Sequence, residues 1–171
     1  ANLGAWMSRW SAEALDEAVS MLSSAPKYDH PDWFDAAFKV RERWCDGAES
    51  LAIPTWFYGH EPSNLFSSHI AKYFANALRE DGLLARATWG IVFAPGSAGT
   101  IQEIFQDAAQ NHYGTFRYIS PMIFLGRTYW TETRPVYPLL QQLAEGREYQ
   151  RMLTISDDLD EIVSFIQAHQ P

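Results

Sequence analysis

The chain is poor in cysteine and has no long apolar run. Cys45 is the single cysteine among 171 residues, which excludes an internal disulfide and a metal site built from several cysteines. Because lone cysteines are common in reducing compartments, we expect a cytoplasmic protein. No apolar stretch approaches the roughly 20 residues that a membrane-spanning helix needs, so we expect no membrane partner.

Positive charge is also scarce. The chain has 13 Lys and Arg against 21 Asp and Glu, which gives a net charge of −8. Direct binding to nucleic acid needs a basic surface, so we do not expect it. No segment has the spacing of metal ligands, such as H-E-x-x-H or an Asp-rich loop, so we expect no metal. The three lysines, Lys27, Lys39 and Lys72, stand in no recognisable pyridoxal-phosphate context.

The apolar pattern predicts an α/β protein. Apolar residues make up 47% and charged residues 20% of the chain, as in globular proteins. Period-2 and period-3.6 segments alternate at least four times, which indicates a parallel sheet with helices on its faces. We find no linker that divides the chain and expect a single domain over 1–171. Strands are predicted at 51–58, 91–94, 121–125 and 153–155, and helices at 1–24, 32–44, 65–79, 83–87, 100–114, 138–145 and 159–166.

The sequence leaves the exact start of two predicted helices open. A break at Trp10, with Ser11 capping a second helix, is an alternative to one helix over 1–24. Asn64 or Ser63 is a reasonable N-cap for the helix at 65–79.

The most informative stretch is the turn between the strand at 91–94 and the following helix. It reads Pro95-Gly-Ser-Ala-Gly-Thr100, and Ile101, Ile104, Phe105 and Ala108 then recur with helical spacing. Backbone N–H groups at a helix start lack partners within the helix, and the dipole there is positive. Two glycines let a ligand approach the main chain closely. A phosphate held by Gly96, Ser97, Ala98, Gly99 and Thr100 is one interpretation; a plain turn with cap residues is the other.

The string Pro95-Gly-Ser-Ala-Gly-Thr-Ile-Gln-Glu103 resembles the P-G-G-x-G-T-x-x-E signature of the LOG (Lonely Guy) family, whose members were long labelled lysine decarboxylases. Ser97 stands where the family usually has its second glycine. The resemblance implies a Rossmann-like fold and a homodimer with sites near the dimer interface. It also implies a nucleoside 5′-monophosphate phosphoribohydrolase that uses water and no cofactor. The opening Ala1-Asn2-Leu3-Gly4-Ala5 also resembles a family segment, so we expect the chain to be the C-terminal part of a longer one.

The resemblance also implies catalytic residues. Glu103 would polarise a ribose hydroxyl or orient water, although a solvated helix carboxylate is the alternative. The family uses an arginine in a segment shaped like M-x-x-R-K, and ungapped alignment from Pro95 puts that position at Glu80. The pair is therefore not reproduced, and the neighbouring Arg79 is the substitute that we expect. This departure favours a rival hypothesis, a non-catalytic binder of nucleotides or of the molybdenum cofactor with the same fold.

Three further residues are candidates on position alone. His60 and Glu61 lie in the turn that follows the strand at 51–58. They could line a substrate pocket at this strand end, and a role as plain turn residues is equally consistent with the sequence. His112 follows the helix that begins at the glycine turn. It could approach the base of a nucleotide, and a surface position without a functional role is the alternative.

Overall fold

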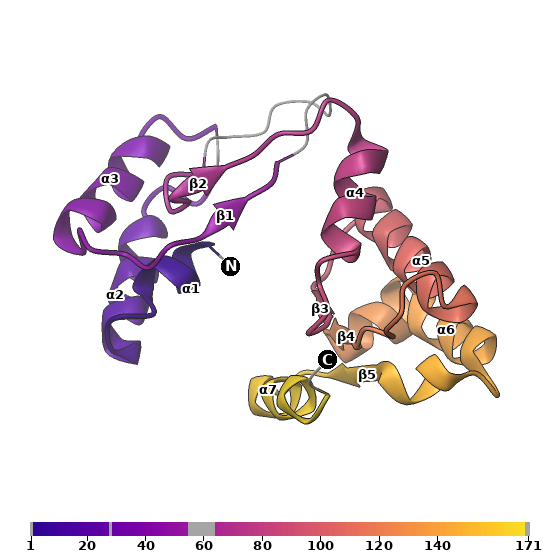
Figure 1. Cartoon of the computed structure of the whole chain (residues 1–171). Coiled ribbons are helices and arrows are strands. Elements are labelled where there is room, and N and C mark those ends of the chain that lie inside the picture. Colours follow the sequence, from indigo (N-terminus) through magenta and orange to yellow (C-terminus); the bar gives the residue numbers. More distant parts are fainter. Residues whose placement is uncertain (1, 28, 55–63, 170–171) are drawn as a thin grey trace. The chain divides into compact units, whose positions relative to one another are not determined.

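A computed structural model describes residues 2–27, 29–54 and 64–169 (Figure 1). The chain divides into two compact units, Ala1–Arg79 and Glu80–Pro171. We describe each unit separately. That the whole chain forms one domain stays a prediction.

The first unit begins with three helices. They are α1 (Asn2–Met7), α2 (Ala12–Leu22) and α3 (Trp33–Arg43). The open question at Trp10 is settled in favour of two helices, because the Ser11 side chain accepts a hydrogen bond from the Ala14 amide at 3.3 Å and caps α2. The predicted helix at 32–44 is confirmed within a residue at each end. The apolar faces of the three helices enclose a small core around Met7, Ala18 and Val40.

The predicted helix at 65–79 is wrong. A short strand, β2 (His69–Ile70), pairs in parallel with β1 (Leu51–Ala52), and α4 starts only at Asn76 and ends at Leu84. Ser68 accepts a hydrogen bond from the Ser50 amide at 2.8 Å, so a local side-chain contact and a strand partner outweigh the helical spacing. Asn64 does not cap a helix, because its side-chain oxygen Oδ1 accepts a hydrogen bond from the Phe66 amide in a turn.

The second unit is built on a three-stranded parallel sheet. Its strands are β3 (Ile91–Phe93), β4 (Met122–Leu125) and β5 (Leu153–Ser156), in the order β3-β4-β5. Helix α5 (Ala98–Tyr113) joins β3 to β4. The connection to β5 holds a π-helix η1 (Tyr129–Thr133), helix α6 (Val136–Ala144) and a 3₁₀ helix η2 (Glu148–Met152), and α7 (Leu159–Ala168) follows β5. The strands predicted in this half are confirmed to within a residue or two.

Helices cover both faces of this sheet, as the predicted fold class requires. Figure 1 shows α5 and α6 on one side of the strands and α7 on the other. Met122 and Phe124 of β4 pack into a core with Ile104 of α5 and Leu140 of α6. Ile123 points to the opposite face and is fully buried as well, which fits a strand covered on both sides. The protein is therefore an α/β protein with Rossmann-like parallel strands.

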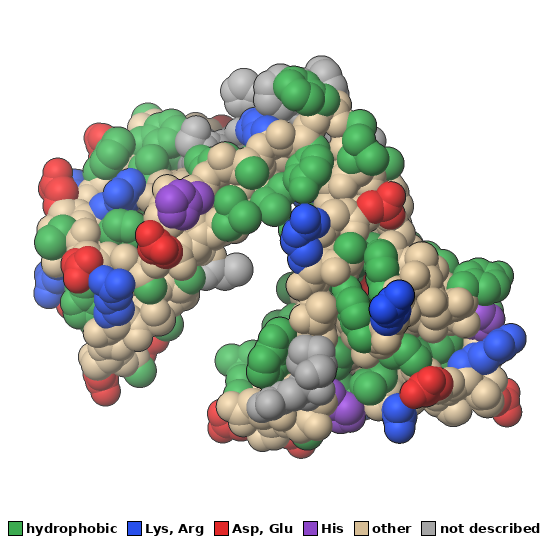
Figure 2. Space-filling model, in the orientation of Figure 1, with side chains coloured by type: hydrophobic (Ala, Val, Ile, Leu, Met, Phe, Trp, Pro, Cys, Tyr) green, Lys and Arg blue, Asp and Glu red, His purple; other side chains and the backbone are tan. Residues whose placement is uncertain are grey.

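No helix in the described ranges is long and apolar enough to cross a bilayer. On the face drawn in Figure 2, basic and acidic side chains are interspersed and no continuous basic surface forms.

Candidate functional site

The glycine turn lies where the sequence places it, at the carboxyl end of β3 and the start of α5. The helix begins at Ala98, two residues earlier than predicted, so Ala98 and Gly99 belong to its first turn. The first helical hydrogen bond runs from the Ile101 amide to the Ser97 carbonyl at 3.0 Å. Within the described residues, the amides of Ala98, Gly99 and Thr100 have no hydrogen-bond acceptor.

This helix start lacks the side chains that usually satisfy such amides. Ser97 occupies the N-cap position with φ −111° and ψ −147°, and its side chain makes no capping hydrogen bond. No acidic residue stands in the first turn of α5. Three unpaired N–H groups and the positive end of the helix dipole therefore face the carboxyl edge of the sheet, where parallel α/β sheets bind ligands. An anion is the ligand that this arrangement suits.

The two glycines of the turn have different roles. A Cβ atom on Gly96 would stand 2.1 Å from Thr100 Oγ1 and 2.7 Å from Thr100 Cβ, so the Thr100 side chain fills the space that any larger residue needs. A Cβ atom on Gly99 would meet nothing within 4 Å. Gly96 is thus required by packing inside the turn, whereas Gly99 leaves open the space next to the unpaired amides.

Residues after β4 hold the turn in place, and the sequence analysis missed them. The Tyr129 hydroxyl donates to the Gly96 carbonyl oxygen at 2.5 Å. The buried Trp130 indole N–H lies 3.1 Å from both the Phe93 and the Leu125 carbonyl oxygens and so links the ends of β3 and β4. Gly126, with φ +102°, sits against the Pro95 ring. The sequence does show Gly126 and the pair Tyr129-Trp130 soon after a predicted strand. Nothing in their spacing, however, indicates that they contact the turn at Pro95.

Glu103 lies in the second turn of α5 and is half-buried. Its spacing from Thr100 puts the two side chains on the same side of the helix. The Glu103 side chain therefore leaves the helix about one turn after these amides.

The arginine substitute expected from the family resemblance belongs to the first unit. Arg79 Nε donates to Asn76 Oδ1 at 2.8 Å, and Arg79 Nη1 donates to the Ile53 carbonyl at 3.3 Å. Glu80, at the aligned arginine position, is 1% exposed and accepts a hydrogen bond from Gln102 Nε2 at 2.5 Å. Glu80 therefore joins α4 to α5 and is part of the packing of the second unit.

The structure brings one unforeseen arginine to the carboxyl edge of the sheet. The Arg127 amide donates to Asp157 Oδ1 at 2.8 Å, and the Arg127 guanidinium donates to the Ile155 carbonyl at 2.9 Å. These contacts turn its side chain toward β5, on the far side of β4 from the glycine turn. His60 and Glu61 lie outside the described residues.

A buried carboxyl lies on the core side of α5. Asp107 is 1% exposed; its Oδ1 accepts from the Ser120 hydroxyl at 3.1 Å, and its Oδ2 has no partner within the described residues. Burial raises the pKa of Asp107 to about 7, against a smaller lowering effect of the Ser120 hydrogen bond. The carboxyl faces the Ser120–Asn111 pair and is a packing feature of the unit, separate from the turn.

No cluster of three or more His, Cys, Asp and Glu side chains that could hold a metal ion occurs within the described ranges. No protein-family model matches the chain, and the search of curated proteins finds no match either.

Proposed function

We propose that the chain hydrolyses the N-glycosidic bond of a nucleoside 5′-monophosphate and releases the free base and ribose 5-phosphate. One observation carries the proposal: the first turn of α5 presents three unpaired amides and no capping side chain, within the string that resembles the LOG signature. A phosphate is the common biological group that such a helix start binds.

The 5′-phosphate would accept hydrogen bonds from the amides of Ala98, Gly99 and Thr100. The open space at Gly99 admits a phosphate oxygen close to the main chain. The hydrogen bond from Tyr129 to Gly96 fixes the turn before the ligand arrives, so little ordering cost is left for binding.

Glu103 would serve the sugar. A water molecule adds to C1′ while the bond from C1′ to the base nitrogen breaks, and the transition state has oxocarbenium character. A carboxylate one turn from the phosphate site can accept the proton of that water or hold a ribose hydroxyl. The base nitrogen leaves with a proton taken from solvent or from Glu103.

The test is incubation of the 171-residue chain with a panel of nucleoside 5′-monophosphates, with free base and ribose 5-phosphate measured by chromatography. The proposal expects release of one or more bases in equal amounts with ribose 5-phosphate. The matching free nucleosides serve as the control, because they lack the phosphate that the turn binds, and their turnover should be far slower. Equal turnover of nucleosides and nucleotides would contradict the proposed role of the turn.

One observation favours a second candidate, a carrier that binds a nucleotide or pterin phosphate without chemistry. The family's arginine position is occupied by the buried Glu80, which is committed to Gln102. A binder would show a higher melting temperature with AMP or a phosphorylated pterin, since a ligand that binds only the folded state stabilises it. The same samples would then release no base over extended incubation.

A further inference from the structure

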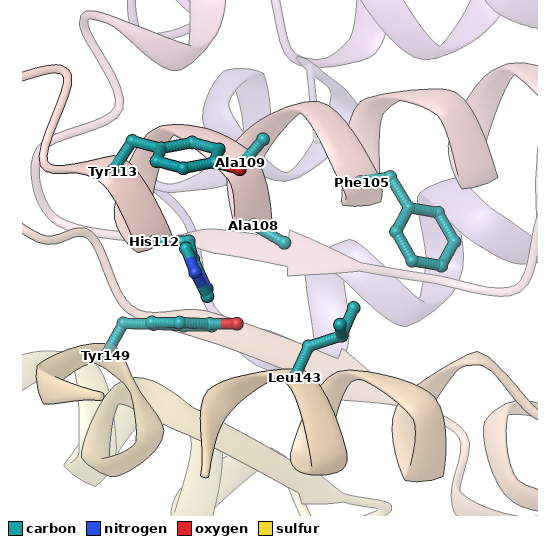
Figure 3. A pocket seen from close by; sticks show the side chains of 7 residues that line it. All are labelled: Phe105, Ala108, Ala109, His112, Tyr113, Leu143 and Tyr149. Carbon is teal, nitrogen blue, oxygen red and sulfur yellow. The ribbon is translucent and has the colours of Figure 1, made fainter. Parts of the chain in front are cut away.

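A second concave feature lies at the other end of α5. Thr100 and His112 are twelve positions apart, which puts the two features roughly 18 Å apart along the helix axis. The pocket holds about 220 Å³ and opens between the C-terminal half of α5, helix α6 and η2 (Figure 3). Its walls are formed by Phe105, Ala108, Ala109, His112, Tyr113, Leu143 and Tyr149. The two alanines leave the space open, because no larger side chain on α5 fills it.

Two polar groups in this wall have no hydrogen-bond partner among the described residues. Tyr149 is 1% exposed, yet its hydroxyl forms no hydrogen bond with any described residue. Figure 3 shows that hydroxyl pointing along the pocket toward Leu143. His112 makes edge contacts with the Tyr149 ring at 5.8 Å and the Tyr113 ring at 5.0 Å, and no described residue hydrogen-bonds to its nitrogens. The Tyr149 hydroxyl is thus left as a donor and acceptor that faces the pocket, where a ligand that enters could hydrogen-bond to it.

The residues that line the pocket determine which kind of ligand it can bind. The lining consists mostly of aromatic rings and aliphatic carbon, which favours a planar apolar ring, because such a ring gains both burial and aromatic contact. A charged ligand would lose its hydration without an opposite charge among the lining residues. Burial raises the pKa of the Tyr149 hydroxyl, more than the nearby Arg147 charge lowers it, so the hydroxyl stays a neutral donor at neutral pH.

We propose that this pocket binds a small neutral aromatic compound with one hydrogen-bonding group, of the size of phenol or indole, with its polar group on the Tyr149 hydroxyl and the His112 ring. The volume fits, since an apolar cavity of about 150 Å³ is sufficient for benzene. The site is independent of the glycine turn and of the proposed hydrolysis.

Calorimetric titration of the chain with phenol, and with toluene as the probe without a hydroxyl, tests the proposal. Phenol should bind one per chain. Tyr149→Phe removes only the hydroxyl and should weaken phenol binding about 3- to 10-fold while leaving toluene binding unchanged. Ala109→Leu introduces a larger side chain at an exposed helical position of the wall and should abolish binding of both probes. Ala168→Leu, the same change at an exposed position in the last turn of α7, should bind as the wild type does.

Three results would overturn the proposal. One is unchanged phenol binding in Ala109→Leu. Another is an equal response of phenol and toluene to Tyr149→Phe. The third is no phenol binding together with a dimer, seen by light scattering, that Ala109→Leu dissociates, because a second copy would then occupy the pocket. Tyr113 lines the pocket and is 81% exposed, so a second copy could pack against it, and the oligomeric state has to be measured.

Discussion

Helices α5 and α7 both begin at the carboxyl edge of the same parallel sheet, but their first turns are built differently. In α7 the Asp158 side chain accepts hydrogen bonds from the Asp160 amide at 2.8 Å and the Glu161 amide at 3.3 Å, and both of those residues are acidic. In α5 the corresponding amides have no side-chain cap, and the first turn holds no acidic residue. The α7 start has a side-chain cap for two of its amides, whereas the α5 amides have no acceptor among the described residues and are open to solvent or to the proposed anion.

On the proposed function, the α5 N-terminus is a binding site because it lacks the capping side chain and the first-turn acids that α7 has. Every α-helix has unpaired amides at its start, and most are satisfied by a cap. Carboxylates at the α7 start complete it and would repel a phosphate. Gly99 in the first turn of α5 places no side chain in the space that a ligand would occupy.

The largest expected effect is on the rate of base release, and it should differ between a carboxylate of α5 and one of α7. Replacing Glu103 in α5 by Gln should lower base release about 10²- to 10⁴-fold, because the side chain loses its ability to accept a proton. Replacing Glu161 in α7 by Gln should leave the rate within about twofold. Rates are measured under saturating substrate, and circular dichroism checks the fold of both variants. A full rate in Glu103→Gln would remove Glu103 from the mechanism.

A buried acid on α5 gives the second prediction. The folded-state pKa of Asp107, about 7, lies above the ordinary value of 3.8, so folding favours the protonated carboxyl. The stability that this contributes is complete below the unfolded-state pKa and is lost as pH rises through 7. Urea unfolding should show a loss on the order of 3 kcal/mol between about pH 5 and pH 8 from this group.

Asp107→Asn keeps the shape of the protonated carboxyl and should remove that pH dependence. The variant should be the more stable protein at about pH 8. Asp160→Asn, on the exposed start of α7, is the matched control and should leave the pH profile as it is. An unchanged slope in Asp107→Asn would show that the carboxyl is hydrated or paired in solution.

The two glycines of the α5 turn give a third prediction of intermediate size. Gly96→Ala forces a Cβ atom into the Thr100 side chain and should cost roughly 1–3 kcal/mol of stability. Gly99→Ala meets no neighbour and should keep or slightly raise stability, since alanine favours a helix. If the anion approaches Gly99 closely, this second variant should still lose the stabilisation by AMP. Thermal melts with and without AMP measure both effects, and a Gly96→Ala protein as stable as the wild type would contradict the packing role.

The smallest effect belongs to the α7 cap. Asp158→Ala removes the acceptor for two amides and should lower the unfolding free energy by about 1 kcal/mol. Stabilisation by AMP should be unchanged, because α7 keeps its acidic first turn. A stronger response of this variant to AMP would show that an empty α7 start binds anions as well, and that the contrast with α5 rests on capping alone.

The sequence alone predicts much of the second unit and less of the first. The spacing of Ile101, Ile104 and Ala108, and the short apolar strands before and after, identify β3, α5 and β4 almost residue for residue, because a strand covered on both faces is a continuous apolar run. The same reasoning fails at 65–79. There the spacing of Leu65, Ile70, Phe74 and Leu78 imitates a helix, while pairing of His69–Ile70 with Leu51–Ala52 decides the structure.

For the candidate site, too, the sequence identifies the local residues but not those that the fold brings to it. Its glycines and Thr100 are visible as a local string, since all of them belong to one turn. Tyr129 and Trp130 are more than 25 positions away along the chain and reach the turn only because β3 and β4 are neighbours in the sheet. Asp107 and Tyr149 fall at ordinary helical positions, and only packing distinguishes them from surface residues.

Titration of ¹⁵N-labelled protein with AMP, followed by amide NMR, tests the central contrast most directly. The account predicts saturable shifts of the Ala98, Gly99 and Thr100 amides as they receive the phosphate, and no comparable shifts of the Asp160 and Glu161 amides. Unmoved α5 amides at AMP concentrations well above those of cells, or shifts of equal size at the two helix starts, would contradict it.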